Sequence, residues 1–217
     1  MAARLNVALM MGLLLWSSPG QARPVTEAQR QEQLSRYEVV LISEPQAAGG
    51  LRHRAMGLFD ASAEEIFRIA TSYERYSEYM PRIVASHVVS QGSEHALVTL
   101  EAALPWPMSN LWVLARYQTD AFLDDNDRQA YRVRFGMVRG NLLRYEGLLS
   151  IEPYGEGRAM VTYELVAEPD TRMPRSWVQR SVGRGVSNFV NFLRARVSQC
   201  HRLMRASVAG ELCTSRP

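Results

Sequence analysis

The sequence predicts an α+β domain in which a curved antiparallel β-sheet wraps around one long carboxy-terminal α-helix, with two short helices after the first strands. Three observations support this prediction. Residues 174–205 carry apolar side chains at intervals of three and four, the spacing that lines one face of a helix. Several segments of about ten residues with alternating polarity precede this helix, as is typical of strands. Short turns separate these segments, and short connections favour antiparallel neighbours.

The first 22 residues have the features of a secretory signal peptide. Arg4 gives a positive start, residues 7–16 form an uninterrupted apolar run, and small residues precede a cleavage position after Ala22. A membrane anchor fits less well, because a spanning helix needs about 20 apolar residues and this run is about half as long. We therefore expect cleavage and a periplasmic or secreted location.

The rest of the chain is expected to contain one domain between two short flanking segments. Residues 23–35 are polar and rich in glutamine, and they form a lead-in that is either a short surface helix or disordered. Residues 36–205 hold the whole pattern of strands and helices and are long enough for one well-buried domain. Residues 206–217 are expected to form a tail.

The first strands and short helices follow from local signals. Two strands are expected at residues 37–43 and 51–59, joined as a hairpin by a turn-rich connection. Ser62 and Glu65 have the spacing of a capping box and start the first short helix. A second short helix is expected at residues 73–79. It ends before a proline, since the residue preceding proline is disfavoured in helical geometry.

Six further strands follow, and their alternation sorts the side chains onto two faces. Tyr131, Val133 and Phe135 point one way, whereas Arg132 and Arg134 point the other. The same pattern in the next two strands makes one face aromatic and aliphatic and the other charged. The apolar face is expected to lie against the long helix. The six strands are expected at residues 83–90, 96–104, 111–119, 129–137, 142–151 and 158–168.

Charge is distributed unevenly along the chain, and all basic residues are arginine. Residues 23–171 carry 15 arginines against 21 acidic residues, whereas residues 172–217 carry nine arginines against Glu211 alone. Two interpretations remain open: a solvated helix face that pairs with acidic residues of the domain, or docking to an anionic membrane. No nucleic-acid partner is expected, and the oligomeric state is left open. The membrane-contact candidates are Arg172, Arg175, Arg180 and Arg184.

Cys200 and Cys213 are the only cysteines. In an exported protein an even number of cysteines favours a disulfide, but Cys200 also falls on the apolar stripe of the long helix, where a buried thiol fits equally well. Both alternatives remain open. Two cysteines at this spacing, beside a single histidine, do not make a metal site.

The sequence contains no pattern typical of catalysis. The four histidines are scattered, and there is no Gly-x-Ser-x-Gly elbow, phosphate-binding glycine loop or paired-cysteine motif. We therefore expect no metal, no cofactor, and binding rather than turnover. Gly183 and Gly185 lie inside the long helix, where each costs about 1 kcal/mol relative to alanine. Close packing against a bulky sheet residue and clearance for a ligand are both possible reasons.

Several short stretches match a known superfamily: Phe59-Asp60-Ala61-Ser62, Tyr73-Glu74-Arg75-Tyr76, Tyr79-Met80-Pro81, Val161-Thr162-Tyr163-Glu164-Leu165, Pro174 and Trp177. In these stretches the chain resembles the START-like helix-grip superfamily (SRPBCC), which includes START lipid-transfer domains, polyketide cyclases/dehydrases and coenzyme Q-binding proteins. The resemblance covers residues 36–205. It departs from the usual pattern at Ser72 and Ser77, where members often have aspartate and proline.

The resemblance implies a helix-grip fold with a hydrophobic cavity between the sheet and the last helix. We expect an exported protein that holds a lipid-, quinone- or polyketide-like ligand there. One alternative is a cyclase or dehydratase, which requires an inward charge such as Arg116 or Glu101; another is a protein-interaction module with a collapsed cavity. The residues expected to line the cavity and its mouth are Tyr76, Tyr79, Met80, Trp106, Met108, Tyr117, Tyr131, Phe135, Tyr145, Tyr163, Trp177, Val182, Gly185 and Phe189.

Overall fold

The computed structural model describes residues 26–47, 49–104, 109–170 and 173–205. The predicted signal peptide and the predicted carboxy-terminal tail lie outside these ranges. The same is true of four residues proposed above as site or disulfide candidates: Trp106, Met108, Arg172 and Cys213.

Within the described residues, eight strands form one antiparallel sheet in the order β1-β2-β8-β7-β6-β5-β4-β3. Consecutive strands from β3 to β8 are neighbours. Strand β2 pairs with β8 on one side and with β1 on the other, so β1 and β3 are the edge strands. This arrangement confirms the predicted antiparallel sheet. The strands are β1 (Val40–Pro45), β2 (Leu51–Phe59), β3 (Ile83–Gln91), β4 (His95–Ala102), β5 (Leu111–Leu123), β6 (Gln129–Gly140), β7 (Leu142–Pro153) and β8 (Ala159–Pro169).

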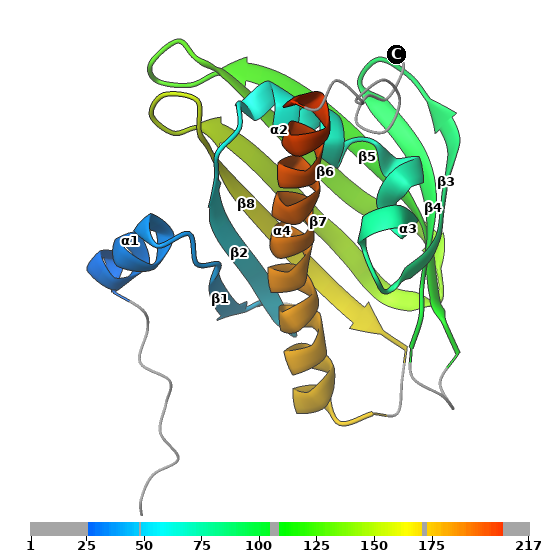
Figure 1. Ribbon diagram of the computed structural model, residues 1–217. Helices are drawn as coiled ribbons and strands as arrows, with labels where there is room; N and C mark the ends of the chain where they lie inside the picture. Colours follow the sequence, from blue (N-terminus) through cyan, green and yellow to red (C-terminus); the bar gives the residue numbers. More distant parts are fainter. Residues whose placement is uncertain (1–25, 48, 105–108, 171–172, 206–217) are drawn as a thin grey trace, which may run out of the picture.

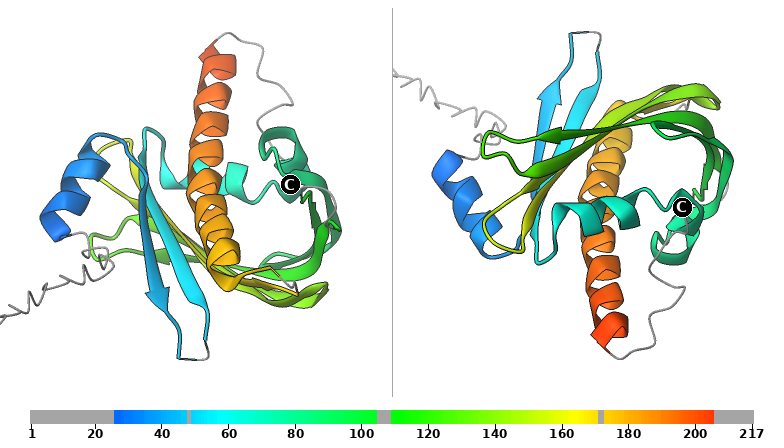
Figure 2. Two further views of the ribbon diagram at one scale, coloured as in Figure 1. Left: turned by 90° about the horizontal axis from the view of Figure 1, so that it is seen from below. Right: turned by 90° about the horizontal axis from the view of Figure 1, so that it is seen from above.

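The long helix α4 (Arg175–Arg205) crosses the concave face of the sheet, and the strands curve around it (Figure 1 and Figure 2). Its apolar stripe faces the sheet, with Val186, Val190 and Leu193 fully buried in the main core. Burying such side chains supplies most of the stability of an amphipathic helix. The predicted α+β helix-grip architecture is therefore confirmed. None of the helices in the described part of the chain combines the length and hydropathy that a bilayer-spanning segment requires.

Two short helical segments lie between β2 and β3, as predicted, but the second is divided. Helix α2 (Ala63–Ala70) begins at Ser62, whose hydroxyl accepts a hydrogen bond from the Glu65 amide at 3.3 Å. The predicted helix at 73–79 consists of a 3₁₀ turn, η1 (Tyr73–Arg75), followed by α3 (Tyr76–Tyr79). These segments lie beside α4, between it and the strands β3 to β7.

The lead-in contains a helix, α1 (Glu27–Ser35), which settles the alternative left open above for these residues. A capping box between Thr26 and Gln29 starts it. Leu34 then packs against Val40 and Leu58 on the outer face of β1 and β2, so α1 covers the convex side at this edge of the sheet.

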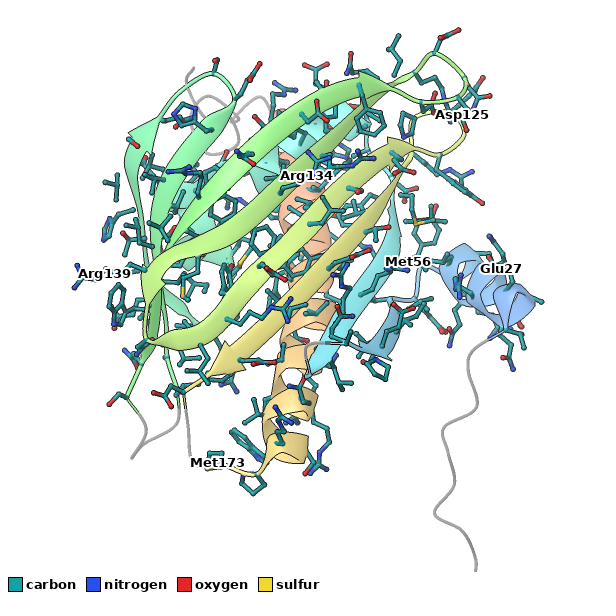
Figure 3. All side chains as sticks on the ribbon, turned by 180° about the vertical axis from the view of Figure 1, so that it is seen from behind. Glu27, Met56, Asp125, Arg134, Arg139 and Met173 are labelled. Atoms are coloured by element: carbon teal, nitrogen blue, oxygen red, sulfur yellow. The ribbon has the colours of Figure 1, made fainter. Side chains whose placement is uncertain are left out.

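The convex face is the charged face, as the alternation predicts. Arg54 and Glu164 are directly opposite each other on β2 and β8, and their side chains are 2.7 Å apart. Arg134 also projects from this face, away from α4 (Figure 3). The apolar side chains of the same strands point inward, and the space between them and α4 is where the predicted site lies.

Candidate functional site

Four aromatic rings connect the sheet to α4, and we call them the aromatic ladder: Tyr117, Phe135, Tyr163 and Phe189. The ring centroids of Tyr117 and Phe135 are 5.4 Å apart, those of Phe135 and Tyr163 are 5.9 Å apart, and those of Tyr163 and Phe189 are 4.0 Å apart. All three contacts are stacked. The ladder therefore fills the middle of the space in which the sequence predicts a cavity.

The ring of Phe135 lies over Gly147, its neighbour on β7. A Cβ atom on Gly147 would lie 2.4 Å from Cζ of Phe135, which is closer than such atoms approach. The same Cβ atom would lie 2.1 Å from the backbone carbonyl oxygen of Glu164, so the neighbouring strand and the ring above both require a glycine here.

The two ends of the space between sheet and helix differ in how well they are closed. Toward the carboxy-terminal half of α4, inward side chains such as Val133, Ile151 and Val161 are buried. Toward the amino-terminal half of α4, several inward apolar side chains remain partly exposed although they pack against the core. They come from the inner face of the sheet and from the facing side of α4, so apolar surface between the two is left uncovered. We call these residues the groove mouth: Met137, Leu142, Tyr145, Leu165, Val182 and Phe189.

The two glycines of α4 have different surroundings. Close packing explains one of them, and open space surrounds the other. A Cβ atom on Gly183 would lie 3.1 Å from Nδ1 of His53, so this glycine packs closely against the sheet. A Cβ atom on Gly185 would have no neighbouring atom within 4 Å. Gly185 lies between Val182 and Phe189 on the helix, so the open space adjoins the groove mouth.

Several tyrosine hydroxyls face inward beside the ladder. The hydroxyl oxygens of Tyr117 and Tyr145 are 3.5 Å apart, and the hydroxyl of Tyr163 lies near that of Tyr145. Burial raises the pKa of all three phenols, so they are protonated and uncharged at neutral pH. This arrangement provides neutral hydrogen-bonding groups within an otherwise apolar surface.

Several predicted site residues come together at the ladder and the groove mouth, and others do not. Tyr131 lies at the opposite end of β6, where its ring stacks on Phe67 of α2 at 4.4 Å. Tyr76 is buried beside the ladder, and its hydroxyl donates to the carbonyl oxygen of Ala70 at 2.6 Å, which serves the fold. The predicted residues that do meet are Tyr117, Phe135, Tyr145, Tyr163, Val182, Gly185 and Phe189.

The other predicted residues surround this space at its edges. Tyr79 lies on α3, and its ring contacts that of Tyr76 edge-on at 5.9 Å. Met80 is buried at the end of the same helix. Trp177 is half-buried in the first turns of α4, and Arg175, Arg180 and Arg184 are exposed on the same helix.

Two residues near the groove were not predicted. Tyr73 is buried, and its ring lies 4.5 Å from that of Tyr117. Arg196 is 6% exposed on α4 and forms an ion pair of 2.7 Å with Glu78. Arg196 is seven residues after Phe189, so the helical period places both on one face and gives a usable signal. Tyr73 lies in a 3₁₀ turn too short for periodicity to indicate its direction.

The inward charge that a cyclase or dehydratase requires is not at either position suggested above. Arg116 is exposed on the convex face, because its neighbours Ala115 and Tyr117 take the inward positions. Glu101 accepts a hydrogen bond from the Asn110 amide at 2.7 Å in an exposed position. Within the described ranges, no three histidine, cysteine or acidic side chains are grouped so that they could hold a metal ion.

A cavity of about 230 Å³ lies on the other side of α4, away from the aromatic ladder. It is smaller than the roughly 300–1,000 Å³ typical of small-molecule sites. Arg194 forms part of its wall and donates to the carbonyl oxygens of Leu58 at 3.1 Å and Tyr37 at 2.8 Å. These bonds tie α4 to β2 and to the segment before β1, so Arg194 is a structural contact.

Cys200 lies in the buried stripe of α4 and is disulfide-bonded. The only other cysteine in the sequence, Cys213, lies outside the described residues.

The fold resembles several solved structures at low sequence identity. The STAR-related lipid transfer protein from Xanthomonas axonopodis has a TM-score of 0.64 and 18% identity, over 74% of this chain and 93% of that one. Human StAR-related lipid transfer protein 5 has a TM-score of 0.64 and 12% identity, over 75% and 83%. The Zhui aromatase/cyclase from Streptomyces sp. R1128 has a TM-score of 0.56 and 13% identity, over 72% and 96%. These identities establish a shared fold only.

No curated protein matches the sequence. Residues 59–194 match the model of a family described as polyketide cyclase / dehydrase and lipid transport. The matched segment runs from the end of β2 into α4 and covers more than half of the chain. The START-like resemblance predicted from the motifs is therefore confirmed, and the chain belongs to the polyketide cyclase / dehydrase and lipid transport family.

Proposed function

We propose that this protein binds a lipid-, quinone- or polyketide-like molecule between the sheet and the amino-terminal half of α4. The observation that carries the proposal is the groove mouth, where inward apolar side chains remain partly exposed beside the open space at Gly185. Apolar surface left uncovered in this way is typical of a binding site. The membership of a lipid transport and cyclase family supports the same ligand class.

The aromatic ladder determines how deep a ligand reaches. A ligand confined to the groove mouth would cover Val182 and Phe189, whereas a longer one would have to separate the rings of Tyr163 and Phe189. A stacked pair contributes roughly 0.5–1.5 kcal/mol beyond the burial of its surface, and an apolar ligand between the rings replaces that contact. The ladder is thus a barrier that a ligand can cross.

Binding without turnover is the favoured form of this function. Neither Arg116 nor Glu101 faces the groove, the phenols beside the ladder are uncharged, and the buried cation Arg196 is paired with Glu78. A protein-interaction module with a collapsed cavity agrees with the stacked rings, but it does not account for the apolar surface at the groove mouth.

The proposal includes export and a peripheral contact with an anionic membrane. Residues 1–22 have the pattern of a signal peptide, and the disulfide at Cys200 suits an oxidising compartment. Arg175, Arg180 and Arg184 are exposed, and none of them forms an ion pair with a described residue. Arginines without acidic partners favour the second of the two interpretations given above, in which they meet anionic headgroups.

A pair of leucine substitutions on α4 tests the proposed groove. Gly185→Leu places a side chain in the open space, whereas Asn191→Leu adds one at an exposed position on the solvent side of the helix. We expect Gly185→Leu to weaken binding of Nile red, a neutral apolar dye, at least tenfold in a fluorescence titration, because it blocks the groove. Asn191→Leu should bind as the wild type does. Equal binding by both variants would place the dye elsewhere and contradict the proposal.

A further inference from the structure

Four tyrosine side chains from four elements converge between the sheet and α4, and we call them the phenol cluster: Tyr73, Tyr117, Tyr145 and Tyr163. The ring of Tyr73 in η1 lies 4.5 Å from that of Tyr117 in β5. The hydroxyl of Tyr145 in β7 lies 3.5 Å from that of Tyr117 and near that of Tyr163 in β8. The cluster adjoins the groove mouth, because Tyr145 belongs to both.

Hydrogen bonds within the phenol cluster leave part of it unsatisfied. The hydroxyl oxygens of Tyr117 and Tyr145 are 3.5 Å apart, at the limit of hydrogen-bond distance. The hydroxyl of Tyr73 is buried and has no hydrogen-bond partner among the described residues. Buried donors without an acceptor are rare in folded proteins and require an explanation.

The surroundings of the phenol cluster favour an uncharged partner. Burial raises the pKa of all four phenols, which therefore stay protonated and neutral. Arg196 is a buried cation on the same face of α4 as Phe189, but it is paired with the Glu78 carboxylate at 2.7 Å. An anion placed in the cluster would lose its hydration without gaining a cation of its own.

We propose that the phenol cluster binds the hydroxyl or carbonyl oxygen of an uncharged ligand whose apolar part occupies the groove mouth. The inference rests on the proposed function and narrows its ligand class. It favours neutral oxygen-bearing molecules over fatty acids and over phospholipids inserted head first. Tyr73 and Tyr145 supply the hydrogen bonds, because Tyr73 has no partner and Tyr145 lies at the groove mouth.

Replacing Tyr73 by phenylalanine has opposite effects on stability and on binding if the inference is right. The substitution removes a buried hydroxyl without a partner, so the thermal unfolding midpoint of the ligand-free protein should be unchanged or higher. A lower midpoint would show that the hydroxyl already has a partner, such as an ordered water, and would overturn the assignment of Tyr73.

The binding test uses three probes with the same ring system, naphthalene, 2-naphthol and 2-naphthoate, in isothermal titrations. Wild type, Tyr73→Phe and Tyr145→Phe are compared, with Tyr154→Phe as control, since Tyr154 is exposed in a turn. We expect wild type to bind 2-naphthol about fivefold more tightly than naphthalene, as one added neutral hydrogen bond implies. The 2-naphthoate anion should bind more weakly than either.

The variants separate the inference from the proposed function. Tyr73→Phe and Tyr145→Phe should lose the preference for 2-naphthol and keep their affinity for naphthalene, and Tyr154→Phe should match the wild type. If wild type binds 2-naphthol and naphthalene equally, or prefers 2-naphthoate, the inference fails while the groove remains a binding site. If wild type binds none of the three probes, the proposed function fails together with the inference.

Discussion

His53 joins the β1–β2 hairpin to α4 through both of its ring nitrogens. Nδ1 lies 2.8 Å from the Ser43 hydroxyl, and Nε2 lies 3.0 Å from the side-chain oxygen of Gln179. A neutral ring satisfies both contacts, because Nδ1 accepts from Ser43 and Nε2 donates to Gln179. Gly183 of α4 packs directly against this ring. The packing of His53 therefore explains why α4 carries a glycine here.

The buried position of His53 makes the stability of the fold depend on pH. Burial lowers the pKa of His53 below its usual 6.5, although the hydrogen bond to Gln179 opposes this. The unfolded chain therefore binds this proton at a higher pH than the folded chain does. The contribution of His53 to stability is complete above about pH 6.5 and is lost as the pH falls through that value toward the folded pKa.

Urea unfolding at pH 7.5 and pH 5 measures this dependence. The free energy of unfolding of wild type should fall more between the two pH values than that of His53→Gln, which lacks the titrating ring. All other titrating groups are common to both proteins, so their contribution cancels. An equal fall in both proteins would show that His53 is not protonated more readily in the unfolded chain.

At the scale of single elements, α4 presents different chemistry on different sides. Its buried stripe packs against the sheet, and Gly183 and Arg194 contact residues of β2. Phe189 and Gly185 face the groove mouth, and Arg180 and Arg184 lie on the solvent side. The sequence predicts the stripe because its period is that of a helix. It does not separate Gly183 from Gly185, because what each glycine faces depends on residues far away in the sequence.

The solvent side of α4 is tested with lipid vesicles. Arg180→Gln with Arg184→Gln should reduce cosedimentation with vesicles of phosphatidylcholine and phosphatidylglycerol at least tenfold, since each arginine near an anionic surface contributes about 1 kcal/mol. The matched control is Arg116→Gln with Arg134→Gln, which changes the net charge equally on the convex face of the sheet. Equal losses in both proteins would indicate attraction by net charge alone. If the wild-type protein does not cosediment with anionic vesicles, the proposed membrane contact is wrong.

The strands show where local pattern stops being informative. Alternation predicts that β5 ends at Thr119, but the strand continues to Leu123 because Asp120 to Leu123 pair with the start of β6. Strand β6 likewise extends to Gly140 through a bulge opposite Leu114 and Ala115. Asp120 and Gly140 are of residue types that are depleted in strands, so the sequence hides these extensions, and pairing with a neighbouring strand maintains them.

At the scale of the whole molecule, the groove lies at the end of the space between sheet and α4 where inward apolar side chains are partly exposed. Inward side chains beside the carboxy-terminal half of α4, such as Ile151 and Val161, are buried, whereas Val182 and Phe189 in its amino-terminal half are partly exposed. The sequence predicts the inward aromatic side chains through alternation. It does not predict that Tyr117, Phe135 and Tyr163 stack on one another, since stacking depends on strand register, curvature and the flat surface at Gly147.

The central claim is that the groove between the sheet and α4 holds a hydrophobic ligand. Native mass spectrometry of protein purified from its own membrane fraction, combined with organic extraction, measures this most directly. We predict that wild type carries a bound hydrophobic molecule that extraction releases, and that Gly185→Leu purified in the same way carries much less of it. Wild-type protein that is consistently empty, or a Gly185→Leu variant that carries the same ligand to the same extent, would contradict the claim.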